Sequence, residues 1–233
     1  MDPRKGVVAI KSSPQSDAIL GAGFFVSSGV ILTCAHVIEG YYHRDMTVYF
    51  QAADSHEVLG AGLEFYSPKE EFDVAVLKPR RAIDCACLRV VSSRESRLHE
   101  FSIFGYPALG DIHGLNGAGR ILGWIQSPRG YAQLQLESRQ VTQGFSGAPI
   151  WDLELESVVG MLQNGIKAEE AGRPSFGLPM EVLKGIYPDL PLETPVAKSD
   201  DGAAADQGGV TLNISGDVSG NIIIGSHNTA KRN

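Results

Sequence analysis

The stretch QGFSGAPIWD, residues 143–152, places Ser146 between glycines and other small residues. Small residues suit a tight turn, and turns rich in glycine and serine occur in loops of every kind. A serine hydroxyl is a poor nucleophile at neutral pH and becomes reactive when a neighbouring base takes its proton. Whether Ser146 has a chemical role therefore depends on the other residues of the chain and on their order.

Around this stretch, short apolar segments recur between turn signals, as in FDVAVLK, FSIFGY and YAQLQLES. Most are about four to eight residues long, rich in Val, Ile, Phe and Tyr, and bounded by Gly, Pro, Ser or Asp, which is typical of an all-β sandwich or barrel. PMEVLKGIY near residue 180 predicts a short helix, and CAHVIEG could hold a single helical turn.

The chain has 233 residues with a net charge of −7, so a nucleic-acid backbone is not an expected partner. Its three cysteines, Cys34, Cys85 and Cys87, do not form a disulfide framework by number or spacing. Cys85 and Cys87 are expected on one face of a strand. Because no second Cys or His pair lies at ligand spacing, we expect no metal and no cofactor.

The segment MDPRKGVVAIK is charged and then only briefly apolar, unlike the apolar core of a signal peptide. No run is long enough to span a bilayer. These features predict a cytoplasmic protein with no membrane partner.

The β pattern stops after YPDLPLETP, which predicts three parts. Residues 1–187 form the main domain. Residues 188–209 contain almost no large apolar side chains and are expected to be a flexible linker. Residues 210–233 contain the echo ISGD, VSGN followed by NIIIG, which predicts a short Gly/Asn-rich β association segment.

Two residues could serve a nucleophilic serine. Five of the six histidines have polar or turn-like surroundings, whereas His36 follows the strand-like GVILTC and precedes apolar residues. Asp73 begins the apolar segment DVAVLK, where a buried acid must be paired or hydrogen-bonded. Each has an ordinary structural alternative: a buried histidine for His36, and a strand-end cap for Asp73.

The order His36, Asp73, Ser146 is the chain order of the chymotrypsin-type triad. GAGFFVSSGVILTCAHVI, FDVAVLK, GFSGAPI, VVGMLQNG and SFGLPM together resemble the trypsin-like, chymotrypsin-fold serine peptidases over roughly residues 5–187. The resemblance implies two antiparallel six-stranded β-barrels with the active site between them and a short C-terminal helix. It implies Ser146 as nucleophile, His36 as general base and Asp73 as the residue that orients His36.

The glycines next to the serine fit the same chemistry. Gly144 has no side chain, so its N–H and that of Ser146 can face one point and form an oxyanion hole. Phe145 stands where trypsin-type zymogens place an acid that receives a newly cut N-terminus. The chain is in this respect similar to intracellular bacterial members of the fold, which are controlled by loop ordering or by partners.

The resemblance places Gln140 near the base of the primary substrate pocket, with walls around Gly165 and Ser175. No acid is evident there, so strict cleavage after Lys or Arg is not expected. If Arg139 turned inward, an acidic substrate side chain would be favoured instead.

Two alternatives remain to be weighed. An α/β-hydrolase would need a histidine after Ser146. Only His227 follows it, in the tail beyond the expected linker, and the alternation of strands and helices typical of that fold is missing. A chymotrypsin fold kept as a non-catalytic binding module would usually lose a triad residue. The expected function is therefore a serine endopeptidase acting on protein or peptide substrates.

The tail resembles short Gly/Asn-rich β segments joined to trypsin-like domains in bacterial multidomain proteins, some of them linked to defence systems. Residues 210–229 are the candidate element for a homo-oligomer or a regulatory protein partner, because short strands with isoleucines cannot bury them alone.

Overall fold

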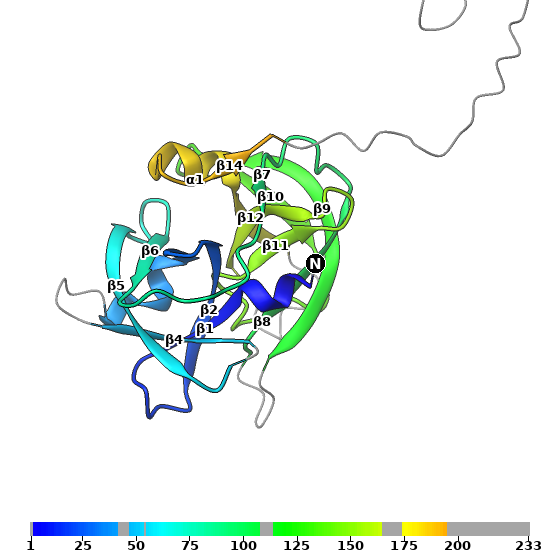
Figure 1. Ribbon diagram of the computed structural model, residues 1–233. Helices are drawn as coiled ribbons and strands as arrows, with labels where there is room; N and C mark the ends of the chain where they lie inside the picture. Colours follow the sequence, from blue (N-terminus) through cyan, green and yellow to red (C-terminus); the bar gives the residue numbers. More distant parts are fainter. Residues whose placement is uncertain (1, 42–46, 54, 108–113, 165–173, 195–233) are drawn as a thin grey trace, which may run out of the picture. The chain divides into compact units, whose positions relative to one another are not determined.

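The computed structural model describes residues 2–41, 47–53, 55–107, 114–164 and 174–194. The first half of the chain forms a closed six-stranded antiparallel barrel (Figure 1) with the strand order β1-β2-β3-β6-β5-β4. Its strands are β1 (Val7–Lys11), β2 (Ile19–Ser27), β3 (Val30–Thr33), β4 (Val48–Ala52), β5 (Val58–Ser67) and β6 (Val74–Pro79).

The register of β3 on β6 brings two candidate residues to the same end of this barrel. Thr33 pairs with Ala75 in an antiparallel ladder. The chain therefore leaves β3 towards His36 at the same edge where it enters β6 after Asp73. A 3₁₀ turn, Ala35–Val37, then carries His36, as the single turn expected in CAHVIEG.

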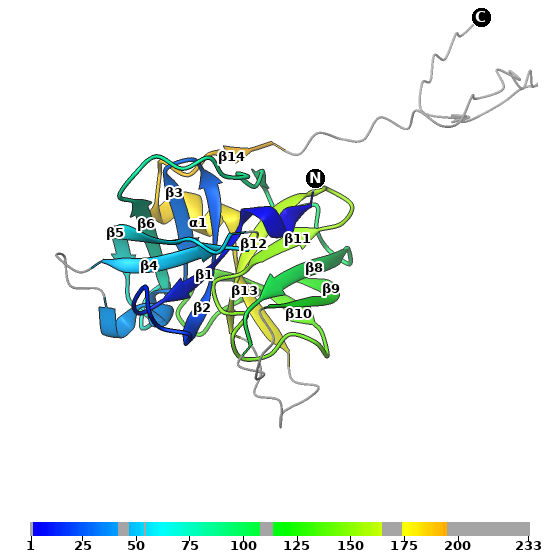
Figure 2. The same cartoon turned by 60° about the horizontal axis from the view of Figure 1, so that its bottom comes forward.

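The second half forms another six-stranded barrel, which the pairing of β11 with β12 closes (Figure 2). Its strands, in barrel order, are β11 (Pro149–Asp152), β8 (Glu100–Gly105), β9 (Leu115–Gln126), β10 (Ala132–Glu137), β13 (Ser175–Pro179) and β12 (Ser157–Asn164). The predicted pair of six-stranded barrels is thus confirmed.

Two short strands extend the second barrel. β7 (Val90–Val91) pairs in parallel with β12, and β14 (Leu192–Glu193) pairs in parallel with β7. Leu190, just before β14, is fully buried, so the contacts of the chain with this barrel extend past the expected end of the main domain at residue 187.

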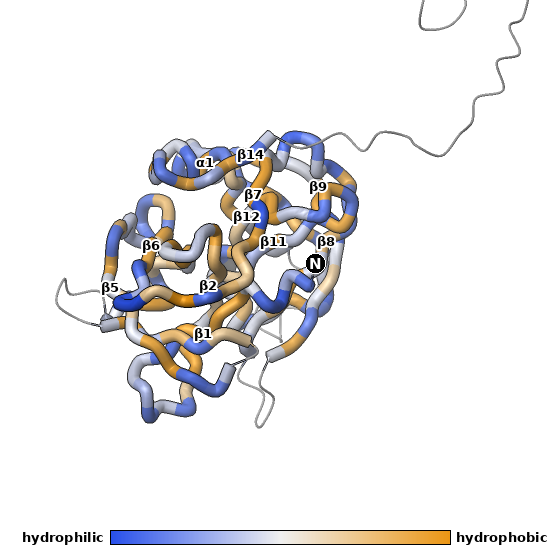
Figure 3. The backbone as a smooth tube through the Cα atoms, viewed as in Figure 1, coloured by the Kyte–Doolittle hydropathy of each residue, from blue (hydrophilic) through white to orange (hydrophobic). Residues whose placement is uncertain are grey.

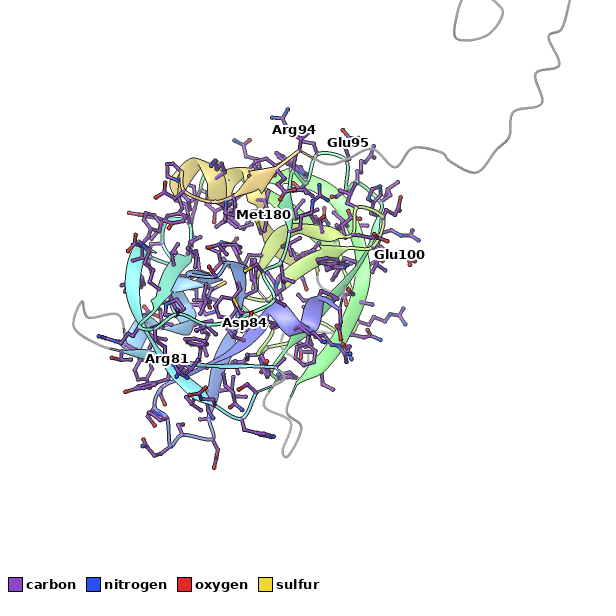
Figure 4. The ribbon with its side chains drawn as sticks, viewed as in Figure 1. Arg81, Asp84, Arg94, Glu95, Glu100 and Met180 are labelled. Carbon is purple, nitrogen blue, oxygen red and sulfur yellow. The ribbon has the colours of Figure 1, made fainter. Side chains whose placement is uncertain are left out.

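The predicted helix is α1 (Met180–Ile186), and its first residue, Met180, is fully buried (Figure 4). No helix in the described ranges has the length and apolarity that crossing a membrane requires.

The apolar residues lie mainly on the strands, while many peripheral turns are hydrophilic (Figure 3). They form two clusters, and each cluster draws on both barrels. Val7 and Ala9 of β1 belong to the cluster that fills the second barrel. Trp151 and Met161 of the second barrel belong to the cluster centred on the first. The two barrels are therefore held together by shared apolar packing.

The connector between the barrels differs from the sequence expectation. Cys85 and Cys87 do not lie on a strand, because residues 82–89 have no regular structure. Their sulfur atoms are 3.8 Å apart. Burial, and next the hydrogen bond with Cys87, raise the pKa of the Cys85 thiol to about 12. Arg81 and Asp84 of the same connector line a cavity of about 670 Å³ against the first barrel (Figure 4).

Candidate active site

His36 and Asp73 are joined by two hydrogen bonds. The backbone N–H of His36 donates to Asp73 Oδ1 at 3.0 Å, and His36 Nδ1 lies 2.8 Å from Asp73 Oδ2. The side chain of Asp73 is only 5% exposed, so both of its oxygens are satisfied inside the protein. The bonds fix the plane of the imidazole relative to the carboxylate.

This arrangement selects the tautomer of His36. A carboxylate only accepts hydrogen bonds, so Nδ1 carries the hydrogen and Nε2 presents its lone pair. Among the described residues, no group is hydrogen-bonded to Nε2. The His36 side chain is 23% exposed, which leaves this nitrogen available to take a proton from a neighbouring hydroxyl.

His99 shows what a purely structural histidine looks like in the same chain. Its Nδ1 lies 2.9 Å from Asp152 Oδ2, and its Nε2 lies 3.2 Å from Glu154 Oε2. Both ring nitrogens face carboxylates, so neither is left without a partner. The pairing of His36 is different because it involves one ring nitrogen only.

Ser146 lies where its turn packs on the first barrel. The N–H of Ala22 in β2 donates to the backbone oxygen of Ser146 at 2.9 Å. A Cβ placed at Gly21 would lie 2.7 Å from Val37 and 3.1 Å from that same oxygen, so only glycine fits between the two segments. Gly21 therefore lies between Val37, the residue that follows His36, and the backbone of Ser146.

The hydroxyl of Ser146 donates to the backbone oxygen of Gln163 at 3.4 Å. In the described part of the chain this is its one hydrogen bond. Among the described residues no hydrogen bond joins this hydroxyl to His36. A catalytic serine–histidine bond is often poorly formed without substrate and tightens when substrate binds.

Two glycines make this turn sterically feasible. Gly147 has a φ of 84°, and a Cβ there would collide with the carbonyl oxygen of Ala22. Gly144 has a φ of 102°, and a Cβ there would lie 2.6 Å from the carbonyl oxygen of Tyr106. Both backbones are in the left-handed region that favours glycine.

The N–H groups of the turn alternate in their use. Phe145 N–H donates to Thr142 O at 3.3 Å, and Gly147 N–H donates to Leu162 O at 2.8 Å. Within the described ranges, the N–H groups of Gly144 and Ser146 have no acceptor. These are the two donors that the sequence assigns to an oxyanion hole.

Phe145 is fully buried, and its ring packs against Gly105, where a Cβ would lie 2.5 Å from Phe145 Cδ1. An apolar ring in this place has no means of pairing with an N-terminal amine.

Cys34 lies directly beside the pair. Its Sγ donates to Leu162 O at 3.2 Å. This sulfur, a ring nitrogen of His36 and a carboxylate oxygen of Asp73 all lie within 4.8 Å of one another. Burial, and next the charge of Asp73, raise the pKa of the Cys34 thiol well above its usual range. The thiol therefore remains protonated at neutral pH and does not compete with Ser146 as a nucleophile.

The expected pocket residues are only partly placed. Gln140 is exposed, and its Oε1 accepts a hydrogen bond from Ala118 N at 2.9 Å. Ser175, at the start of β13, is fully buried, and its Oγ has no hydrogen-bond partner among the described residues. Gly165 lies outside the described residues, as do residues 210–229.

Sequence reasoning did not identify Gln163. It lies on β12 and is 3% exposed, and its Nε2 donates to Phe72 O at 2.6 Å, next to Asp73. The available signal was a polar residue that directly follows the apolar segment SVVGML.

Comparisons with known proteins identify the family of the chain. The family model of the trypsin-like peptidase domain matches residues 21–161, a range that includes His36, Asp73 and Ser146. A search of curated proteins gave no match.

Among solved structures, the chain is similar to the Rv3671c protease. A serine-to-alanine mutant from M. tuberculosis H37Rv in an inactive form is 24% identical with a TM-score of 0.62, covering 81% of this chain and 87% of that chain. The inactive form of the protease is 23% identical with a TM-score of 0.60, and the match covers 81% of this chain and 90% of that chain. The active form from M. tuberculosis is 24% identical with a TM-score of 0.61, and the match covers 83% of this chain and 84% of that chain. At this identity the likeness concerns the fold.

Proposed function

The chain belongs to the trypsin-like peptidase family and is a serine peptidase, and we propose that it is an endopeptidase that uses His36, Asp73 and Ser146 as its catalytic triad. The observation that carries this proposal is the double hydrogen bond between His36 and Asp73, which leaves Nε2 of His36 unpaired among the described residues.

In the proposed mechanism, Ser146 Oγ attacks the carbonyl carbon of the scissile peptide while its proton passes to His36 Nε2. Asp73 stabilises the imidazolium that forms, because its Oδ2 already accepts from Nδ1. His36 then protonates the leaving amine, and an acyl-enzyme on Ser146 remains. Water, activated by His36, hydrolyses this ester and restores the serine.

The developing oxyanion needs donors that are already oriented. We assign this role to the N–H groups of Gly144 and Ser146. The N–H groups of Phe145 and Gly147 already have backbone acceptors, which supports the assignment of the other two.

We propose that Gln140, Gly165 and Ser175 line the pocket for the substrate side chain. Gln140 Oε1 is already bonded to a backbone N–H, so its Nε2 is the group it can offer. Ser175 Oγ adds a buried hydroxyl with no partner in the described part of the chain. Such groups suit a neutral polar side chain better than Lys or Arg. A peptide-library profile dominated by cleavage after Lys or Arg would contradict this.

We further propose that loop ordering or a protein partner controls the activity, in a bacterial defence or signalling role. The supporting features are Phe145, which cannot receive an N-terminal amine, and the Gly/Asn-rich motif of residues 210–229. Cleaved-terminus mapping in cells, with Ser146→Ala as the blank, would test this by identifying natural substrates.

The triad is tested by labelling with a fluorophosphonate and by turnover of a protein substrate. We expect wild type to be labelled and Ser146→Ala not. The triad acts as a unit, so His36→Ala and Ser146→Ala should each remove nearly all turnover. Ser102→Ala, which removes a serine on β8, is the matched control and should behave as wild type. Retention of more than about a tenth of the rate in His36→Ala would refute the assignment. Failure to label folded wild type would favour a non-catalytic binding module.

A further inference from the structure

Asp73 is held in a backbone conformation that it would not adopt unaided. Its φ is 57°, in the left-handed region that costs non-glycine residues steric energy. This conformation directs the carboxylate at the end of β3, where both of its oxygens meet His36. A conformation of this kind persists only when surrounding contacts fix it.

The peptide unit that precedes Asp73 is fixed at both of its polar atoms. Its N–H, that of Asp73, donates to Pro68 O at 3.0 Å within the first barrel. Its carbonyl, that of Phe72, accepts from Gln163 Nε2 at 2.6 Å across the interface of the barrels. The angle φ of Asp73 is measured from this peptide plane, so the two bonds fix one side of the angle, while β6, which begins at Val74, fixes the other.

Gln163 is itself oriented. Gln133 of β10 donates to its Oε1 at 2.9 Å, which fixes which end of the amide faces Phe72. Gln163 is 3% exposed, so water does not readily replace either bond. Its backbone oxygen also accepts the hydroxyl of Ser146 at 3.4 Å. One residue therefore contacts the segments that hold the acid and the nucleophile.

The second barrel contacts the same turn at two further points. Arg129 Nη1 donates to Lys69 O and to Glu71 O, the latter at 3.2 Å. The rings of Tyr131 and Phe72 lie 5.0 Å apart with a tilt of 39°. These contacts surround a cavity of about 50 Å³ that Asp73 and Gln163 both line.

We propose that Gln163, supported by Arg129, is the positioning residue that holds Asp73 in its left-handed conformation and so aligns His36. The inference rests on the proposed triad, because it concerns the residue that orients its base. In this proposal a side chain of the second barrel, Gln163, controls the orientation of two residues of the first barrel, Asp73 and His36.

The test compares three variants. Gln163→Glu keeps the length of the side chain and an acceptor for Gln133, but in its ionised form it has no donor for Phe72 O. Gln163→Met removes both bonds. Arg129→Ala removes the second contact, which lies at an exposed position. Gln51→Met is the matched control, because Gln51 Nε2 also donates to a backbone carbonyl, that of Ser55, at 2.7 Å, but on β4.

We expect both Gln163 variants to lose roughly ten- to hundredfold in kcat with little change in KM, the effect of a misplacement of about 1 Å. The NMR resonance of the His36 Nδ1–H should shift or broaden in the same variants. Arg129→Ala should show the same changes to a smaller degree, and Gln51→Met should show neither. A role in stability alone would lower the melting temperature without moving the resonance or kcat of folded molecules.

A folded Gln163→Glu or Gln163→Met protein with the wild-type resonance and kcat would overturn the proposal. If neither folds, an unchanged resonance and kcat in Arg129→Ala would overturn it. Fluorophosphonate labelling of wild type, absent in Ser146→Ala, tests the triad separately. If labelling fails, the triad is wrong, whereas a labelled wild type with unaffected Gln163 variants disproves only the positioning role.

Discussion

His36 uses both oxygens of Asp73, one through its backbone N–H and the other through its ring Nδ1. Both groups that face the carboxylate are therefore donors. An amide at the same position would have to turn its NH₂ group towards one of them.

We therefore expect Asp73→Asn to lower kcat by about 10⁴-fold, because the amide cannot hold the imidazole in the tautomer that presents a basic Nε2. The measurement is kcat on a peptide substrate. Asp152→Asn changes a second histidine–aspartate pair of the described residues and is the control. It should lower stability but leave the kcat of folded protein unchanged. Nearly equal losses of kcat in the two variants would count against a special role for Asp73.

Gly147 and Gly130 have nearly the same φ angles, 84° and 86°. Substitutions at these two positions therefore separate the cost of the left-handed backbone conformation from the cost of a steric clash. Nothing lies within 4 Å of a Cβ at Gly130, whereas at Gly147 it would meet the carbonyl of Ala22. Gly130→Ala should lower the free energy of unfolding by about 1–2 kcal/mol, the cost of a left-handed non-glycine residue. Gly147→Ala should cost distinctly more and also lower activity. Urea unfolding checks both, and equal costs would show that the contact does not matter.

The burial of Phe145 predicts that no free N-terminus is needed for activity. A protein that begins at Lys5, and one with a blocked amine, should retain most of the wild-type kcat. The Asp2–Arg4 ion pair is lost in the shortened form, but it lies among exposed side chains and is worth little. The test measures kcat for both forms beside wild type. A strict requirement for a new amine created by cleavage would be incompatible with this prediction.

Residues 210–229 are expected to mediate self-association or partner binding, apart from catalysis. Truncation after residue 196 keeps β14 and the ion pair of Arg89 with Glu193, 2.8 Å long, so the catalytic domain should remain intact. Truncation after Pro188 removes both, together with the buried Leu190, and is the comparison that would lose stability. Light scattering of the full and shortened chains measures association. Identical masses, alone and with candidate partners, would argue against the role.

The sequence predicted what its local strings encode. Short apolar segments indicated an all-β sandwich or barrel, and the resemblance to trypsin-like peptidases specified two barrels. The surroundings of His36 and Asp73 distinguished them from other histidines and acids. Gln163 could not be assigned in this way, because its partner Phe72 is 91 residues away and the two meet only through the packing of one barrel on the other. Strand β14 was missed because a two-residue strand carries no periodicity.

The sharing of apolar clusters between the barrels has a consequence for cooperativity. Val7 and Ala9 cannot leave the second cluster unless β1 leaves the first barrel. In the same way, Trp151 and Met161 cannot leave the first cluster unless their strands leave the second barrel. We therefore expect the two barrels to melt together, in a single calorimetric transition. Neither barrel should fold as a separate fragment, because each would expose apolar side chains that only the other covers.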